Sequence, residues 1–128
     1  MLSAKPTVAE LSILRVLWEN GPSTVRDVYE SVYQGTNVGY TSALKLLQNM
    51  HAKGLVTRNE ESKQHLYRAA VQQRRTLNGV VRQWIDGSFG GSSAELAMQA
   101  LEAKPVTVGE LNKLKAMIQR LEERGVKP

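Results

Sequence analysis

Apolar residues recur at spacings of three and four over the first half of the chain, which is the period of a helix with one buried face. Leucines and a tryptophan over residues 11–18 predict a first helix. The capping sequence at residues 7–10 opens it, and Asn-Gly-Pro at residues 20–22 ends it. Valines and a tyrosine predict a second helix over residues 24–33, with Ser23 as its N-cap. The chain therefore begins with two short helices.

A third helix is predicted over residues 40–53, with Gly54 as its C-terminal stop. Its apolar residues follow the template i, i+3, i+4, i+7 and are Ala43, Leu46, Leu47 and Met50. The pattern then becomes that of short strands at residues 55–58 and 64–68, joined by a polar turn. Three helices followed by a hairpin is the order of a winged helix-turn-helix.

The remaining residues are predicted to be helical, so the fold class is mainly α with a small β-hairpin. We expect a winged helix-turn-helix domain over residues 1–70 and a helical dimerisation domain over residues 71–128. Capping sequences at residues 92–95 and 107–110 open two of the later helices. Three helices have little room for a closed core of their own, so their apolar residues need either the winged helix or a second chain to pack against, and we expect a second chain. These residues are Leu77, Val81, Trp84, Ile85, Leu111, Leu114, Ile118 and Leu121.

Charge and composition limit the classes of function that the chain can have. The 128 residues carry 17 Lys and Arg against 12 Asp and Glu, a net charge of +5 that is spread along the chain without a basic block. The chain has no cysteine, which excludes disulfides, thiolate metal sites and cysteine nucleophiles. No apolar run is long enough to span a membrane and the N-terminus does not read as a signal peptide, so we expect a cytoplasmic protein without membrane insertion.

The polar side of the third helix is the candidate functional surface. It carries hydroxyl, amide and ammonium groups and no acid, which suits contact with base edges and phosphates of double-stranded DNA. The candidate DNA-binding residues, including two cations of the hairpin, are Tyr40, Thr41, Ser42, Leu44, Lys45, Gln48, Arg58 and Lys63. The alternative is a merely solvated helix face. Leu44 either touches a thymine methyl group or packs against the second helix, and Lys63 is equally well an exposed turn cation.

Several stretches of the chain resemble the penicillinase repressor family. The likeness is carried by residues 9–18, 24–29 and 39–47, by the sequences Lys-Gly-Leu-Val at residues 53–56 and Tyr-Arg-Ala at residues 67–69, and by residues 89–111. The resemblance implies a homodimeric transcriptional repressor that binds dyad operators, often near genes of antibiotic resistance. It also implies relief of repression through a membrane-bound metalloprotease sensor and cleavage in the dimerisation region.

Two departures from the family pattern limit what the resemblance implies. The copper-responsive branch uses a C-terminal cysteine cluster, and this chain has none, which excludes copper sensing by that route. The penicillinase branch is cut at an Asn-Phe bond, whereas the matching place here is the bond between Gln99 and Ala100. Whether this bond is cleaved, and whether the targets are β-lactamase genes, are therefore open questions.

No other chemistry is indicated. His51 and His65 do not form a metal-binding spacing with each other or with acidic residues, and no nucleophile and base are paired, so we expect no metal, no cofactor and no catalysis. The alternative function is a winged-helix protein-interaction module without sequence-specific DNA binding.

Overall fold

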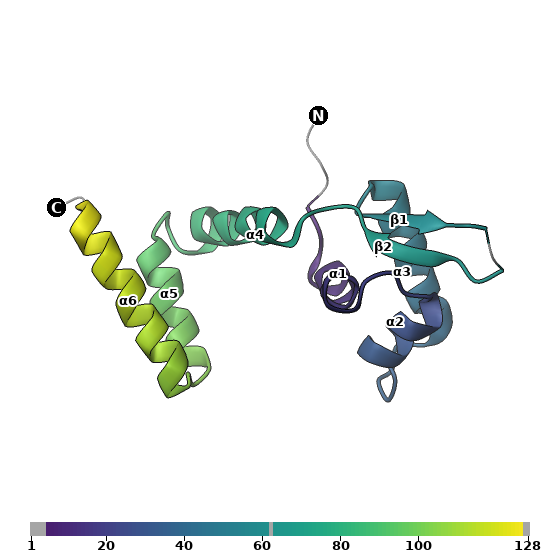
Figure 1. Cartoon of the computed structure of the whole chain (residues 1–128), viewed down its shortest axis with the longest axis horizontal. Helices are drawn as coiled ribbons and strands as arrows, with labels where there is room; N and C mark the ends of the chain where they lie inside the picture. Colours follow the sequence, from purple (N-terminus) through teal and green to yellow (C-terminus); the bar gives the residue numbers. More distant parts are fainter. Residues whose placement is uncertain (1–4, 62, 127–128) are drawn as a thin grey trace. The chain divides into compact units, whose positions relative to one another are not determined.

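The computed structural model describes residues 5–61 and 63–126, and its elements confirm a mainly helical chain with one hairpin (Figure 1). The elements are α1 (Val8–Asn20), α2 (Val25–Val32), α3 (Tyr40–Lys53), β1 (Val56–Asn59), β2 (Leu66–Ala69), α4 (Gln73–Ser88), α5 (Ser93–Ala103) and α6 (Val108–Arg124). The chain forms two compact units, residues 1–83 and residues 84–128, which are described separately. No helix within the described residues combines the length and the hydropathy needed to cross a membrane.

Capping fixes where the helices begin. In α1 the Thr7 hydroxyl accepts a hydrogen bond from the Glu10 N–H at 3.2 Å, and the Glu10 carboxylate accepts one from the Thr7 N–H at 2.9 Å, which confirms the predicted capping box. The prediction for α2 is wrong by one residue, because Thr24 and not Ser23 is the N-cap. The Ser23 hydroxyl donates instead to the Gly21 carbonyl, at 2.9 Å.

The hairpin is tied to the segment between α1 and α2. Strands β1 and β2 are antiparallel, with Val56 opposite Ala69 and Arg58 opposite Tyr67. The Ser23 N–H donates to the Tyr67 carbonyl at 2.9 Å, and the Tyr67 N–H donates to the Ser23 carbonyl at 2.8 Å. This backbone exchange explains why Ser23 does not cap α2: it is held in an extended bridge to β2.

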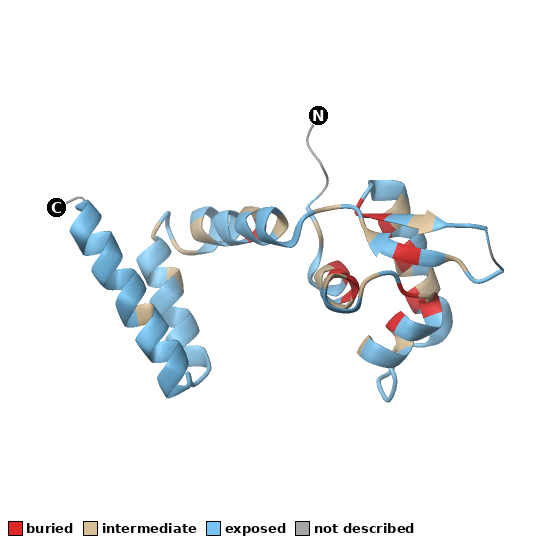
Figure 2. Ribbon diagram, in the orientation of Figure 1, coloured by how far each residue is buried: buried red, intermediate tan, exposed pale blue. Residues whose placement is uncertain are grey.

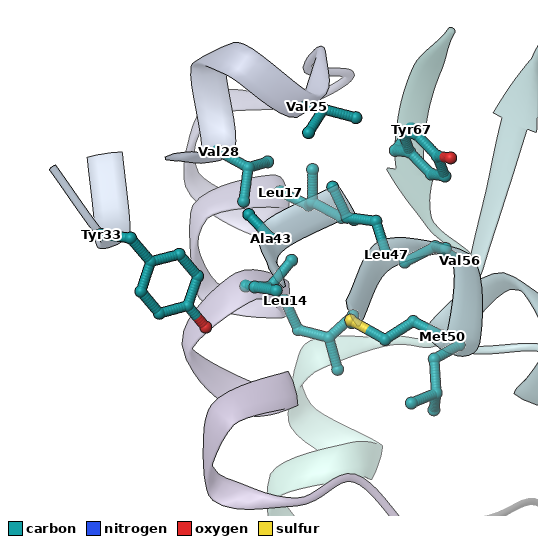
Figure 3. Close-up of a cluster of buried hydrophobic side chains, with 12 residues drawn as sticks. Leu14, Leu17, Val25, Val28, Tyr33, Ala43, Leu47, Met50, Val56 and Tyr67 are labelled. Atoms are coloured by element: carbon teal, nitrogen blue, oxygen red, sulfur yellow. The ribbon is translucent and has the colours of Figure 1, made fainter. Parts of the chain in front are cut away.

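One hydrophobic core holds α1, α2, α3 and the hairpin together. Ala43, Leu47 and Met50 project from α3 into this core with no exposed surface, and Leu14 meets them from α1. Figure 3 shows these side chains converging, with Tyr67 at one end of the cluster and the Tyr33 ring at the other. The buried residues in Figure 2 lie in these elements and in the segments that connect them, apart from Val80 of α4.

An ion pair between a buried carboxylate and a partly exposed lysine joins α1 to the end of α3. The Glu10 side chain is almost fully buried, and its carboxylate accepts hydrogen bonds from Lys53 Nζ at 2.8 and 3.0 Å. Burial raises the pKa of Glu10, but the hydrogen bond from Lys53 and that from the Thr7 backbone outweigh it, so the pKa lies below its ordinary value. Glu10 therefore caps α1 and anchors α3 at once.

The second unit lacks such a core. Neither α5 nor α6 contains a buried residue, although both carry large apolar side chains. Met98 is 50% exposed and Ile118 is 57% exposed. Most of the large apolar side chains of these helices are therefore left exposed within a single chain.

The Glu10 ion pair predicts a specific acid sensitivity. Its stabilisation is complete above the ordinary glutamate pKa of 4.5 and is lost as the pH falls through the lower pKa of the folded state. Glu10→Gln should lower the free energy of unfolding by about 1–2 kcal/mol at pH 7 and remove this part of the pH dependence. Urea unfolding at pH 3–7 measures both effects. Glu19→Gln, in the exposed pair with Arg15, is the control and should cost less than about 0.5 kcal/mol. Equal pH profiles for Glu10→Gln and the unsubstituted chain would contradict the assignment.

A second stability prediction concerns Tyr33. Its hydroxyl is buried without a hydrogen-bond partner among the described residues, and burial raises its pKa. Because an unpaired buried hydroxyl is unfavourable, Tyr33→Phe should raise the free energy of unfolding by about 1 kcal/mol. Tyr67→Phe is the matched control, since the Tyr67 hydroxyl is a hydrogen-bond partner of Arg58 and its removal should not stabilise the fold. A loss of stability in Tyr33→Phe, measured by urea unfolding, would show that its hydroxyl has a partner.

Candidate nucleic-acid interface

Helix α3 presents a polar side opposite the core. Because Ala43 and Leu47 point inward, Thr41, Ser42, Lys45 and Gln48 lie on the open side, and all four are exposed. The N-cap Gly39 makes no side-chain hydrogen bond to the first turn, unlike the side-chain caps of α1, α2, α5 and α6. The start of α3 thus combines backbone N–H groups without a side-chain cap and small hydroxyl side chains, both of which suit a phosphate oxygen.

The Tyr40 ring is fixed by two side chains of α2. The Tyr29 ring meets it edge-on at a centroid distance of 6.1 Å and an angle of 66°, and the Arg26 guanidinium carbon lies 5.3 Å from its centroid. These contacts place an exposed cation beside the entry of α3. Arg26 is absent from the DNA-binding residues predicted from the sequence. Its position in the sequence could have indicated it, because Arg26 is a cation in the first turn of the helix that precedes the candidate reading helix.

A hollow of about 330 Å³ is lined by residues of α2, α3 and the hairpin. It brings together five of the predicted DNA-binding residues: Tyr40, Leu44, Gln48, Arg58 and Lys63. Arg26 also lines the hollow, and no acidic residue does. Thr41, Ser42 and Lys45 lie outside it, on the exposed side of α3. Leu44 is half-buried against the core while it lines the hollow, so its packing role is present in the structure.

The hairpin cations differ from each other. Arg58 Nε donates to Glu60 at 2.6 Å, and hydrogen bonds with Glu60 and then Tyr67 raise the pKa of Arg58. The hydrogen bond from Arg58 and its charge lower the pKa of Glu60 in turn. Lys63 is exposed and makes no ion pair within the described part of the chain. Arg58 therefore offers less free charge to a polyanion than its position in the sequence suggests.

The predicted dimerisation residues lie on α4 and α6. Six of them are exposed, and Ile85 and Leu114 are half-exposed. Further exposed apolar residues of the second unit are absent from the predicted set, and they are Met98, Leu101, Val106, Val108, Met117 and Val126. The sequence could have indicated most of them, because apolar residues on a helix that has no core of its own need another surface to pack against.

The remaining candidates are located as follows. Gln99 and Ala100 are both exposed and lie inside α5. No group of three His, Asp or Glu side chains among residues 5–61 and 63–126 is placed to hold a metal ion.

The family described as "Penicillinase repressor" matches residues 6–120. The chain belongs to the penicillinase repressor family. It is accordingly a transcriptional repressor, and the family comprises regulators and not enzymes. No curated protein matches the chain.

Solved structures agree with the winged-helix fold. A MarR family protein from Bacillus stearothermophilus is 17% identical with a TM-score of 0.54, over 97% of this chain and 78% of that chain. A probable transcriptional regulator from Pseudomonas aeruginosa is 18% identical with a TM-score of 0.50, over 90% and 77%. The PcaV transcriptional regulator from Streptomyces coelicolor, in complex with its natural ligand, is 17% identical with a TM-score of 0.50, over 96% and 79%. At these identities the likeness concerns the fold alone.

Proposed function

We propose that this repressor binds dyad operator DNA as a homodimer and reads bases with α3. The observation that carries the proposal is the rotational setting of α3, which buries Ala43, Leu47 and Met50 and leaves Thr41 and Lys45 open. A helix with short polar side chains at its start fits the major groove, which is about 12 Å wide. Hydroxyl and ammonium groups bond to base edges and phosphates there.

The cations around α3 support contact with the DNA backbone. Arg26 is held beside Tyr40, and Lys63 lies across the hollow on the hairpin. Two cations that flank a reading helix can hold phosphates on either side of a groove, which positions the helix without reading the sequence.

The exposed apolar residues of the second unit support the homodimer. A soluble monomer rarely leaves so many large apolar side chains open on helices without a buried residue. A two-fold dimer places two reading helices one or more turns of DNA apart, at about 34 Å per turn, which matches a dyad operator.

The family resemblance extends the proposal to relief of repression by a membrane-bound metalloprotease sensor. The corresponding bond, between Gln99 and Ala100, lies within the helical hydrogen bonds of α5. A protease binds an extended segment, so α5 would have to open locally before cleavage. Because α5 buries no residue within a single chain, few intramolecular contacts oppose this opening.

The alternative function is a winged-helix module that binds proteins through the same surface. The cation-lined hollow favours DNA over this alternative. Salt dependence separates the two, because phosphate contacts release counterions and weaken steeply with added salt.

The reading helix is tested by Thr41→Ala combined with Lys45→Ala. The DNA probe is a fragment selected from random sequences by the unsubstituted full-length protein. Each lost base contact typically costs about 1–3 kcal/mol, so fluorescence anisotropy should show affinity reduced at least about tenfold, to the level of random DNA. Lys104→Ala, which removes a charge outside α3, is the control and should bind normally. Unchanged affinity in the folded double variant would refute this reading face.

The dimer is tested by Leu114→Asp combined with Ile118→Asp. Charges on these apolar positions should yield monomers in sedimentation velocity, because a carboxylate cannot be buried unpaired in the interface. Asn112→Asp combined with Ala116→Asp adds the same charge to the opposite side of α6 and should stay dimeric. An intact dimer in the first variant would place the interface elsewhere.

A further inference from the structure

A second hollow lies at the start of α4, inside the first unit and apart from the polar side of α3. Its volume is about 420 Å³, within the range of about 300–1,000 Å³ that is usual for small-molecule sites. The side chains of Leu55 and Val80, both buried, line it together with the half-buried Val71. The hollow therefore offers an apolar surface that the fold leaves open.

One wall of the hollow is held in place by a long-range hydrogen bond. Trp18 Nε1 donates to the Val71 carbonyl at 3.0 Å, which ties the segment before α4 to α1. Val80 of α4 lines the same hollow and is itself buried. The apolar wall is thus preformed, as ligand sites usually are, and does not have to be assembled on binding.

The charged groups of the hollow are all cations. Lys5 and Arg75 line it, and no acidic residue does. An adjoining hollow shares Arg75 and is also lined by Arg74 and Arg82. None of these four cations makes an ion pair with a described residue. The apolar wall is therefore bordered by unpaired positive charge.

Gly79 keeps both hollows open. Glycine in the interior of a helix is less stable than alanine, so its presence in the middle of α4 calls for a reason. A Cβ built at Gly79 would meet no heavy atom within 4 Å, so close packing does not require the glycine. Gly79 lines both hollows, and a larger side chain at this position would project into them.

We propose that the hollow beside Gly79 binds a small organic carboxylate with an apolar body. The body lies against Leu55, Val71 and Val80, and the carboxylate accepts hydrogen bonds from the guanidinium of Arg75. Inorganic phosphate can pair with the cations but cannot cover the apolar wall. A neutral hydrocarbon can cover the apolar wall but cannot pair with the cations. This site is separate from the DNA-reading surface, and its test contains no DNA, so its failure leaves the proposed function untouched.

The first measurement is calorimetric titration of the full-length protein with 2-naphthoate, 2-naphthamide and inorganic phosphate. 2-Naphthoate should bind with one site per chain. Because the amide keeps the apolar body and loses the charge, it should bind at least about tenfold more weakly. Equal binding of naphthoate and naphthamide, binding of phosphate alone, or no binding of naphthoate would each overturn the proposal.

Paired variants on α4 locate the site. Arg75→Gln should weaken naphthoate binding about tenfold, whereas Arg74→Gln removes the same charge outside this hollow and should change it less than about twofold. Gly79→Leu should abolish binding by filling the hollow. Gly87→Leu, on the same helix and away from the hollow, should not. Equal effects within either pair would show that naphthoate binds elsewhere.

Discussion

The rotational setting of α3 is the constraint on which the rest of the first unit depends. Ala43, Leu47 and Met50 are fully buried at spacings of four and three, so only one side of the helix fits the core. A rotation by one residue, about 100°, would turn Gln48 toward the core and leave its amide without water or a partner. The pair between Lys53 and Glu10 holds the C-terminal end of the same helix. The direction of the exposed polar groups is therefore decided by burial on the opposite side, not by any contact that those groups make.

The second unit differs from the first, because burial within one chain does not position α5 and α6. Its helices are capped locally, with Thr107 and Glu110 forming a complete capping box at α6, yet neither α5 nor α6 buries a residue within one chain. Local signals thus specify the helices, while the hydrophobic contribution to their stability has to come from association. Under the proposed dimer, the stability of this unit depends on protein concentration, and anything that opens α5 acts on the same helices that hold the two copies together.

The sequence predicted α3 with its observed bounds, because its period, its length and Gly54 agree on one answer. It failed at Ser23, where two neighbouring hydroxyl residues can each cap a helix. The choice falls on Thr24 because Ser23 exchanges backbone hydrogen bonds with Tyr67, a residue of the later hairpin that no local pattern reveals. The placement of Arg26 over Tyr40 and the pairing of Arg58 with Glu60 were missed for a similar reason. Periodicity assigns a side chain to a face but does not say which neighbour it meets.

Under the proposed function, the small number of free cations near α3 gives a reason for the second unit to form a dimer. Arg58 is engaged by Glu60, so the free cations nearest α3 are Arg26, Lys45 and Lys63, which make no ion pair within the described residues. Three phosphate contacts would give a slope of about −3 for the logarithm of affinity against that of salt, and two copies about −5. A single copy with so few contacts would hold DNA weakly at physiological salt. The proposed dimer would answer both needs, because it would double the cations that reach the DNA backbone and would cover the exposed apolar residues of α5 and α6.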